Sequence, residues 1–392
     1  MTSAPRGLFL VALALFTACN GPESGPPGEL AAALPLWVLG PDASVVLRQD
    51  RTLGTLQGPL LPARLSNGDI LVGDVGAREL IVFRDGSRPT RISRQGDGPG
   101  ELSGSFKLLV QSDTIITIGG FDTRFQINYF SPSDGFLTRF RLALPGAFRS
   151  FAPSDRLGTG QFVLQEGRGW RIVGSAPKLG ALVPDSVGLA LFRPGDSTGV
   201  VVEIGRVRPG FRVGHEWPGG PLPSTLAEAP LAPRVLWKAS SDLLWVVDAE
   251  SGEIVIYSGS GSRVLTDTLP LTRHPFDRAA VEHARSVALA NARYDLDRAM
   301  IEAQYDPAVL PGTMPLLDAL VAGTDGGLWI RQFSLNTEPD RVWLVVDRTG
   351  RARARAILPS DFLPHQVGDD FVLGVRKSDD GLEDIVLYQR GR

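Results

Sequence analysis

The chain has 392 residues, 43% of them hydrophobic and 21% charged, a balance that excludes a largely disordered protein. The formal net charge of −3 argues against a nucleic-acid partner, which needs a basic surface. A single cysteine excludes an internal disulfide and any metal site built from several cysteines. The 45 glycines and 30 prolines predict many turns, and they lack the three-residue period of collagen.

Residues 1–18 have the order of regions found in a secretory signal peptide. Arg6 precedes an apolar run over residues 7–16, and the small residues Thr17 and Ala18 follow that run. The run has about half the length of a transmembrane helix, which needs about 20 apolar residues. We therefore expect the segment to be removed, and not to span a membrane in the mature protein.

The only cysteine comes directly after these small residues. Phe16-Thr17-Ala18-Cys19 resembles the lipobox of bacterial lipoproteins, although leucine is more usual where Phe16 stands. The resemblance implies lipidation of Cys19, a membrane anchor of several acyl chains and a flexible tether over residues 19–35. By the bacterial sorting rule, Asn20 implies the outer membrane of the cell envelope. The alternative is an ordinary signal peptide with an incidental cysteine.

Short apolar stretches that end in an Asp or Gly turn recur along residues 36–392. Their equivalent positions are Val72, Ile116, Val163, Trp245, Trp329 and Val372, with gaps of 44, 47, 82, 84 and 43 residues. Three gaps match a four-stranded propeller blade, and two are about twice as long. We predict an all-β fold, a six-bladed β-propeller over residues 36–392, with seven blades as the alternative. Residues 187–192 and 200–207 are expected to be outer strands of a long third blade.

Two further elements complete the predicted ring. Residues 45–47 precede the first blade and are predicted to supply the outer strand of the last blade, which closes the ring. The fourth gap contains a predicted helical insertion, residues 272–311, between blades 4 and 5, in which Ala280, Ala284 and Val287 recur at helical spacing. We expect the insertion to cover one face of the ring or, alternatively, to pack on its own blade.

A Gly-rich turn lies ahead of the second predicted blade. It consists of Gly96, Gly98, Pro99, Gly100 and Glu101, in which Pro99-Gly100 suits a type II turn. The segment resembles the NHL-type β-propeller repeat, and the whole chain is similar to secreted six-bladed propeller lipoproteins of bacteria. The resemblance implies strands over residues 112–118 and 124–130, with Arg124 at the position of the family's arginine. It implies a fold and no single function, because NHL-type propellers bind protein or RNA and related rings include lactonases and lyases.

The sequence lacks several motifs that carry a known reaction mechanism, which excludes specific families and not catalysis in general. It has no P-loop, no H-E-x-x-H zinc pair, no EF-hand loop and no G-x-S-x-G nucleophile elbow. The histidines are His215, His274, His283 and His365, and none is paired at metal-ligand spacing. They are expected to have surface or packing roles.

Acidic residues at strand ends are candidate calcium ligands around the central channel. They are Asp74, Asp248 and Asp347. Carboxylate oxygens suit calcium, as in gluconolactonase-like propellers. The interpretation we favour is that these side chains cap turns, because Asp is a common hydrogen-bonding residue there.

One candidate ligand site lies in a Pro/Gly-rich segment between the third and fourth blades. His215, Glu216 and Trp217 supply an imidazole, a carboxylate and an indole there, and an exposed loop with these groups suits a ligand. The interpretation we favour is a linker with Trp217 packed on the ring.

A second candidate site is an arginine-rich strand near the C-terminus. Arg351, Arg353 and Arg355 alternate with a period of two, which places three guanidinium groups on one face. This face suits a carboxylate or phosphate group. The interpretation we favour is a solvated outer edge strand whose charges prevent unwanted strand pairing.

Together, these observations predict an envelope-anchored β-propeller that binds a protein, peptide or glycan, with no catalysis of its own assumed. One alternative is a metal-dependent, calcium-type hydrolase or lyase with its site in the central channel. That enzyme would need at least three Asp, Glu, Asn or His side chains from different blades around a common point. Another alternative is a structural component of the envelope.

Overall fold

A computed structural model describes residues 34–38, 44–48, 56–84, 88–120, 125–142, 144, 151–167, 182–194, 200–215, 225–229, 231–271, 273, 276–290, 292, 295–307, 309–334, 340–378 and 381–389. The predicted signal peptide, Cys19 and most of the predicted tether therefore lie outside the described residues. Within them, no helix is long and apolar enough to cross a membrane.

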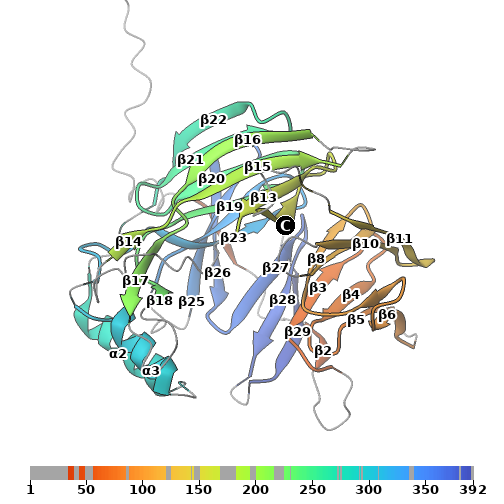
Figure 1. The fold of residues 1–392 in the computed structure, drawn as a ribbon, viewed down its shortest axis with the longest axis horizontal. Coiled ribbons are helices and arrows are strands. Elements are labelled where there is room, and N and C mark those ends of the chain that lie inside the picture. Colours follow the sequence, from red (N-terminus) through yellow and green to blue (C-terminus); the bar gives the residue numbers. More distant parts are fainter. Residues whose placement is uncertain are drawn as a thin grey trace, which may run out of the picture.

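Six antiparallel sheets are arranged around one axis (Figure 1). The first contains β3 (Leu60–Arg64), β4 (Ile70–Asp74), β5 (Glu79–Phe83) and β6 (Thr90–Gln95), with the short β7 (Glu101–Leu102) parallel to β6. The second contains β8 (Phe106–Gln111), β9 (Thr114–Gly119), β10 (Gln126–Ser131) and β11 (Gly135–Arg141). The third contains β12 (Phe151–Arg156), β13 (Phe162–Glu166), β15 (Val187–Arg193) and β16 (Val200–Val207).

The other three sheets complete the ring. The fourth contains β19 (Val235–Ser240), β20 (Leu243–Asp248), β21 (Glu253–Ser258) and β22 (Arg263–Thr268). The fifth contains β23 (Leu317–Ala322), β24 (Leu328–Gln332), β25 (Asp340–Val346) and β26 (Ala352–Pro359), with β1 (Leu36–Val38) parallel to β26. The sixth contains β27 (Phe362–Val367), β28 (Phe371–Lys377), β29 (Glu383–Gln389) and β2 (Ser44–Arg48).

This strand order confirms the six-bladed propeller, and it confirms β15 and β16 as the outer strands of the third blade. The alternative of seven blades is wrong. The strands that remain, β14 (Leu182–Pro184), β17 (Phe211–His215) and β18 (Thr225–Glu228), form a separate three-stranded sheet. They account for part of the long gap between Val163 and Trp245, which is about twice the length of one blade.

The ring closes as predicted, by exchange of a strand between the two ends of the chain. β2 pairs antiparallel with β29, with Ser44 opposite Leu387 and Val45 opposite Val386. The outer strand of the last blade thus comes from the N-terminal side of the first blade. Because β2 and β29 are far apart in sequence, their pairing ties the first blade to the last and leaves no open end in the ring.

The hydrophobic core is divided among the six interfaces between neighbouring blades, each of which has its own cluster of buried side chains. Strand alternation explains this division, because successive side chains point to opposite faces of a sheet. Leu71 thus packs toward the second blade, and Val72 packs toward the sixth. Trp245 and Trp329 are buried in such interfaces, as expected from their position in the repeat.

Two helices, α2 (Arg278–Ala290) and α3 (Asp295–Gln304), follow β22 and precede β23 in the chain. The side chain of Asp277 caps α2 by accepting hydrogen bonds from Ala279 N and Ala280 N. The α3 helix contacts β17 and β18, and Figure 1 places both helices at the periphery beside that small sheet. The expected apolar face is partly wrong, because Val281 is buried whereas Val287 is 45% exposed.

Candidate functional site

The first predicted ligand segment is only partly described. His215 is the last residue of β17, and its backbone pairs with Thr225 of β18. It therefore ends a strand in the small sheet, whereas the sequence suggested a loop. Glu216 and Trp217 lie outside the described residues, so their part of the hypothesis stays a prediction.

Arg353 and Arg355 lie on β26, whereas Arg351 precedes the strand. The expectation that this strand forms an outer edge is wrong. β1 pairs with it, with Leu36 opposite Arg355, and Arg355 N donates to Pro35 O at 2.9 Å. Arg353 Nε donates to Asp347 Oδ2, and Arg351 N donates to Asp347 Oδ1 at 3.1 Å. Arg351 and Arg353 are thus held by the turn that precedes the strand.

The three aspartates at strand ends cap turns, as the favoured interpretation expected. Asp74 accepts hydrogen bonds from Gln57 N and Ala77 N, at 2.6 and 2.9 Å. Asp248 accepts from Glu250 N at 2.7 Å, and Asp347 accepts from Thr349 N at 2.8 Å. Across the part of the chain that the structure describes, no group of three or more His, Cys, Asp or Glu side chains is placed to hold a metal ion.

The Gly-rich turn is held by an arginine that the sequence did not indicate. Glu101 N donates to Gly98 O at 3.0 Å, and Gly100 has a φ of 78°, as in a type II turn. A Cβ atom at Gly100 would lie 2.8 Å from Cβ of Phe136. The guanidinium of Arg139 donates to the carbonyls of Asp97, Gly98 and Glu101. Arg124, the predicted arginine, lies outside the described residues.

Polar side chains lie on the inner strands of four blades, which surround the axis. They are Lys107 of β8, Asp155 of β12, Lys238 of β19 and His365 of β27, here called the axial cluster. Lys107 and Lys238 come from blades separated by the third blade, and Lys238 and His365 from blades separated by the fifth. The Lys238 ammonium nevertheless lowers the pKa of both Lys107 and His365. Its field therefore reaches side chains of blades that are not its neighbours.

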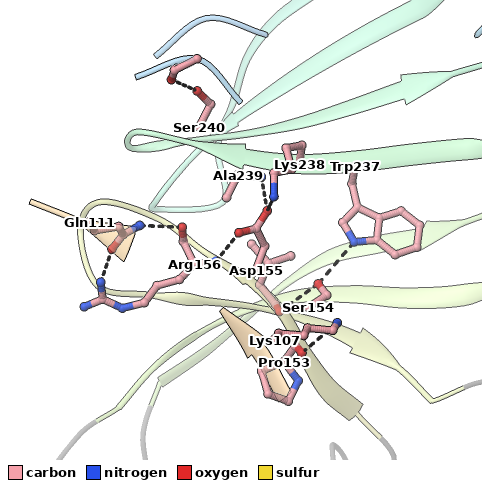
Figure 2. A network of polar contacts seen from close by, with 12 residues as sticks. Lys107, Gln111, Pro153, Ser154, Asp155, Arg156, Trp237, Lys238, Ala239 and Ser240 are labelled. Carbon is pink, nitrogen blue, oxygen red and sulfur yellow. Dashed lines mark hydrogen bonds and ion pairs between the residues drawn. The ribbon is translucent and has the colours of Figure 1, made fainter. Parts of the chain in front are cut away.

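An ion pair forms the centre of the axial cluster (Figure 2). Lys238 Nζ lies 3.0 Å from Asp155 Oδ2, and the Asp155 side chain is 8% exposed. The same oxygen accepts a hydrogen bond from Ala239 N at 2.9 Å, and Asp155 Oδ1 accepts one from Arg156 N. Both carboxylate oxygens are therefore occupied, which fixes the carboxylate between the third and fourth blades.

Two of the inner strands reach the axis through β-bulges. The register of β12 shifts between Pro153 and Asp155, and that of β27 shifts between Pro364 and Gln366. Ser154 and His365 are thus extra residues without a ladder partner. A bulge bends the strand and redirects nearby side chains. The bulges are therefore part of how the ring presents polar groups at its axis.

The hydroxyl of Ser154 is engaged within the protein. Ser154 Oγ donates to Val163 O at 3.1 Å and accepts from Trp237 Nε1 at 3.3 Å (Figure 2). Because its proton is donated to a carbonyl, Ser154 is not arranged as a nucleophile. It links the bulge of β12 to the indole of the next blade.

Lys107 is the least paired of the charged residues in the axial cluster. Its Nζ lies 3.5 Å from Pro153 O, a long hydrogen bond. The Lys107 side chain is exposed on β8, although neighbouring protein atoms displace part of the hydration of its ammonium group. This desolvation lowers the pKa of Lys107, the Asp155 carboxylate opposes the shift, and the Lys238 ammonium adds to it.

His365 is neutral at neutral pH. Burial lowers its pKa to about 4, and repulsion from the nearby Lys238 ammonium acts in the same direction. A neutral imidazole offers one donor and one acceptor to a ligand. With so low a pKa, His365 is a weak general base near pH 7.

The axial cluster was not predicted, although one signal in the sequence points to it. Among the 40 basic residues of the chain only four are lysines, namely Lys107, Lys178, Lys238 and Lys377. Lysine presents a compact point charge, unlike the planar guanidinium of arginine. Two of these four rare residues lie on inner strands that surround the axis.

A small cleft of about 210 Å³ lies at one end of the second blade. Its lining includes Phe106, Gln126, Asn128 and Arg141. Phe106 directly precedes Lys107 on β8. The cleft therefore lies at the blade that carries Lys107. The cleft itself has no titratable cluster among its lining residues.

No protein-family model and no curated protein matches this sequence. Among solved structures, the chain is similar to a protein of Bacteroides fragilis described as exported, at 12% identity over 91% of this chain and 99% of that chain, with a TM-score of 0.43. It is also similar to regucalcin, a calcium-binding protein of Agrobacterium tumefaciens, at 12% identity (91% and 97% covered; TM-score 0.38). A third is virginiamycin B lyase of Staphylococcus aureus, at 12% identity (85% and 95% covered; TM-score 0.38). These sequence identities and TM-scores are too low to assign a function to this chain. The six-bladed fold is established by the strand pairing alone.

Proposed function

We propose that this protein is an envelope-anchored β-propeller that binds a protein, peptide or glycan at the axis of its ring. The observation that carries the proposal is the axial cluster, in which inner strands of three blades carry charged side chains and that of a fourth carries an imidazole, with Lys238 and Asp155 paired. Burying charge lowers the stability of a fold unless the charges are paired. An axis with only a structural role is better filled by apolar side chains, so the retained charges favour a binding role.

The alternative of a metal-dependent hydrolase or lyase has less support. Within the described ranges, no group of three or more His, Cys, Asp or Glu side chains is placed to hold a metal ion. His365, with a pKa of about 4, is a weak base at neutral pH. The proton of Ser154 is donated to Val163 O. These groups suit recognition of a ligand better than proton transfer.

The proposed anchor is a lipid on Cys19 in the outer membrane of a bacterial envelope. Its support is the resemblance of residues 16–19 to a lipobox and the presence of the only cysteine at that position. Residues 19–35 then connect the membrane to β1. In Cys19→Ser, we expect loss of a labelled fatty acid and release of the protein from the membrane fraction. Label on the variant equal to that on the wild type contradicts the anchor.

A photocrosslinking residue at two matched positions tests the binding function in cells. Leu363 is 47% exposed and lies on β27, the strand that carries His365, whereas Val264 is 60% exposed on the outer strand β22. A ligand at the axis gives a defined adduct at Leu363 and not at Val264. Adducts at Val264 alone favour a structural envelope component, and absence of any adduct at Leu363 contradicts binding at the axis.

A further inference from the structure

We propose that the cleft of the second blade is a separate ligand site, which binds a carboxylate carried on a compact apolar body and pairs that carboxylate with Arg141. The site goes beyond the proposed function, because the cleft and the axial cluster have no residue in common. Three features of the cleft support it, namely the row of residues that forms it, the charge of its lining and its size.

The cleft originates in one row of residues that crosses the four strands of the second blade. Phe106 of β8 pairs with Gly119 of β9. Gly119 also pairs with Gln126 of β10, which in turn pairs with Arg141 of β11. Paired residues point to the same face of a sheet, so Gly119 leaves a gap between the side chains on either side of it. Beyond its chain neighbours, the nearest described atom to a Cβ placed at Gly119 is Ser105 O, at 3.8 Å.

Two arginines of β11 lie on this face, and they differ in how their donors are used. Arg139 donates to Asn128 Oδ1 at 2.8 Å and to three carbonyls of the Gly-rich turn. Arg141, two residues further along, is exposed and lines the cleft. Its guanidinium has no hydrogen bond or ion pair to any residue that the structure describes. The donors of Arg139 therefore hold the fold, whereas those of Arg141 are available to a ligand.

The lining of the cleft carries a single positive charge. Arg141 is the charged residue of the described lining, which includes no carboxylate. By contrast, Arg331 and Arg353 on the fifth blade pair with Asp318 and Asp347. A guanidinium without such a partner offers its planar pair of donors to the two oxygens of a ligand carboxylate. One carboxylate balances this charge, whereas a phosphate monoester, with a charge of about −1.5 to −2 at pH 7, exceeds it.

The volume of the cleft limits the rest of the ligand. The cleft has about 210 Å³, and a cavity of roughly 150 Å³ holds benzene. There is therefore room for a body of the size of one ring together with its carboxylate. Leu102 and Phe106, which are 3% and 7% exposed, supply apolar surface to the lining. These dimensions suit a carboxylate of about the size of benzoate.

The test uses fluorobenzoate as the probe, titrated with the full-length protein and followed by the broadening of its fluorine NMR line. Fluorobenzamide is the uncharged probe of the same shape. We expect Arg141→Gln to raise the dissociation constant of fluorobenzoate about tenfold, because a charge-assisted pair is lost. Arg263→Gln is the matched control, since Arg263 is an exposed arginine on the outer strand β22, and it should leave binding unchanged. Fluorobenzamide should bind the wild type about tenfold more weakly than fluorobenzoate.

Gly119→Val tests the cleft itself. Gly119 lies in β9 and outside the positive-φ region, so valine is compatible with its backbone and fills the gap in the row. We expect the broadening of fluorobenzoate to disappear. If Gly119→Val does not fold, Arg141→Gln and the uncharged probe decide alone.

Three results overturn the proposal. They are the absence of broadening with the wild type, equal affinity of the wild type and Arg141→Gln, and equal affinity for fluorobenzoate and fluorobenzamide. Phenyl phosphate that binds as tightly as fluorobenzoate overturns the assignment to a carboxylate.

This test can fail independently of the crosslinking test. Leu363 adducts in cells without fluorobenzoate binding leave the axial binding function standing and remove the cleft site. Fluorobenzoate binding that requires Arg141, without Leu363 adducts, supports the cleft site and contradicts ligand binding at the axis in cells.

Discussion

Asp155 and Lys238 form an ion pair across the interface between the third and fourth blades, with Lys238 Nζ 3.0 Å from Asp155 Oδ2. The same carboxylate oxygen accepts the backbone N–H of Ala239 at 2.9 Å. One side chain of the third blade thus binds both the backbone and a side chain of the fourth. Because the Asp155 side chain is 8% exposed and that of Lys238 is 33% exposed, loss of the Asp155 charge leaves a half-buried ammonium group without its counter-ion.

Asp155→Asn tests this relationship, because it keeps the size of the side chain and removes its charge. We expect the free energy of unfolding to fall by about 2 kcal/mol, measured by urea denaturation at pH 7. Asp361→Asn is the matched control, since Asp361 is 48% exposed and lies 3.7 Å from Arg376. The control should change stability by less than about 1 kcal/mol. Equal losses in the two variants contradict a special role for Asp155.

His365 predicts how stability depends on pH. Its pKa is about 4 in the folded protein and 6.5 in an ordinary environment, so the unfolded chain binds more protons between these values. The stability due to neutral His365 is complete above pH 6.5 and is lost as pH falls toward 4, by up to about 1.4 kcal/mol per pH unit. His365→Gln should flatten this part of the curve. His283→Gln, on the exposed surface of α2, should leave it unchanged, and a flat wild-type curve contradicts the prediction.

The titration of Lys107 tests the electrostatics of the axis directly. Desolvation lowers its pKa, Asp155 raises it and Lys238 lowers it. We expect the midpoint of its acylation against pH to lie below the ordinary value of 10.5. Lys238→Met should move the midpoint up, and Asp155→Asn should move it further down. A midpoint that neither substitution moves shows that Lys107 lies apart from both groups.

Ring closure predicts that β2 contributes to the stability of the whole domain. A variant that lacks residues 1–40 loses β1, and one that lacks residues 1–48 loses β2 as well. The second variant should be less stable than the first by about 2–4 kcal/mol, because several strand hydrogen bonds contribute about 1 kcal/mol each. Urea denaturation measures the difference. Equal stability of the two variants contradicts closure through β2.

The blades could be predicted from the sequence because each repeats a local pattern. Strand alternation and short turns recur at a nearly constant spacing, and the buried positions Val72, Trp245 and Trp329 follow from that repeat. The closing strand could also be predicted, since the last blade lacks an outer strand of its own. The blades depend on residues that are close in sequence. The closing strand follows from the number of strands that the last blade still needs.

The axial cluster could not be predicted in the same way. Its four residues come from different blades and share no motif, so only the closed ring brings them together. The bulges at Ser154 and His365 leave no clear signature in the sequence, yet they redirect the strands that carry the polar groups. The edge predicted at Arg355 failed for a similar reason, because its partner strand β1 lies more than three hundred residues away in sequence.

The most direct test of ligand binding through the axial lysines is the yield of the Leu363 crosslink in cells, compared between the wild-type background and Lys107→Gln/Lys238→Gln. Binding through these lysines predicts that the Leu363 adduct disappears from the double variant while its amount and melting temperature show a folded protein. An undiminished Leu363 adduct in the folded double variant contradicts it.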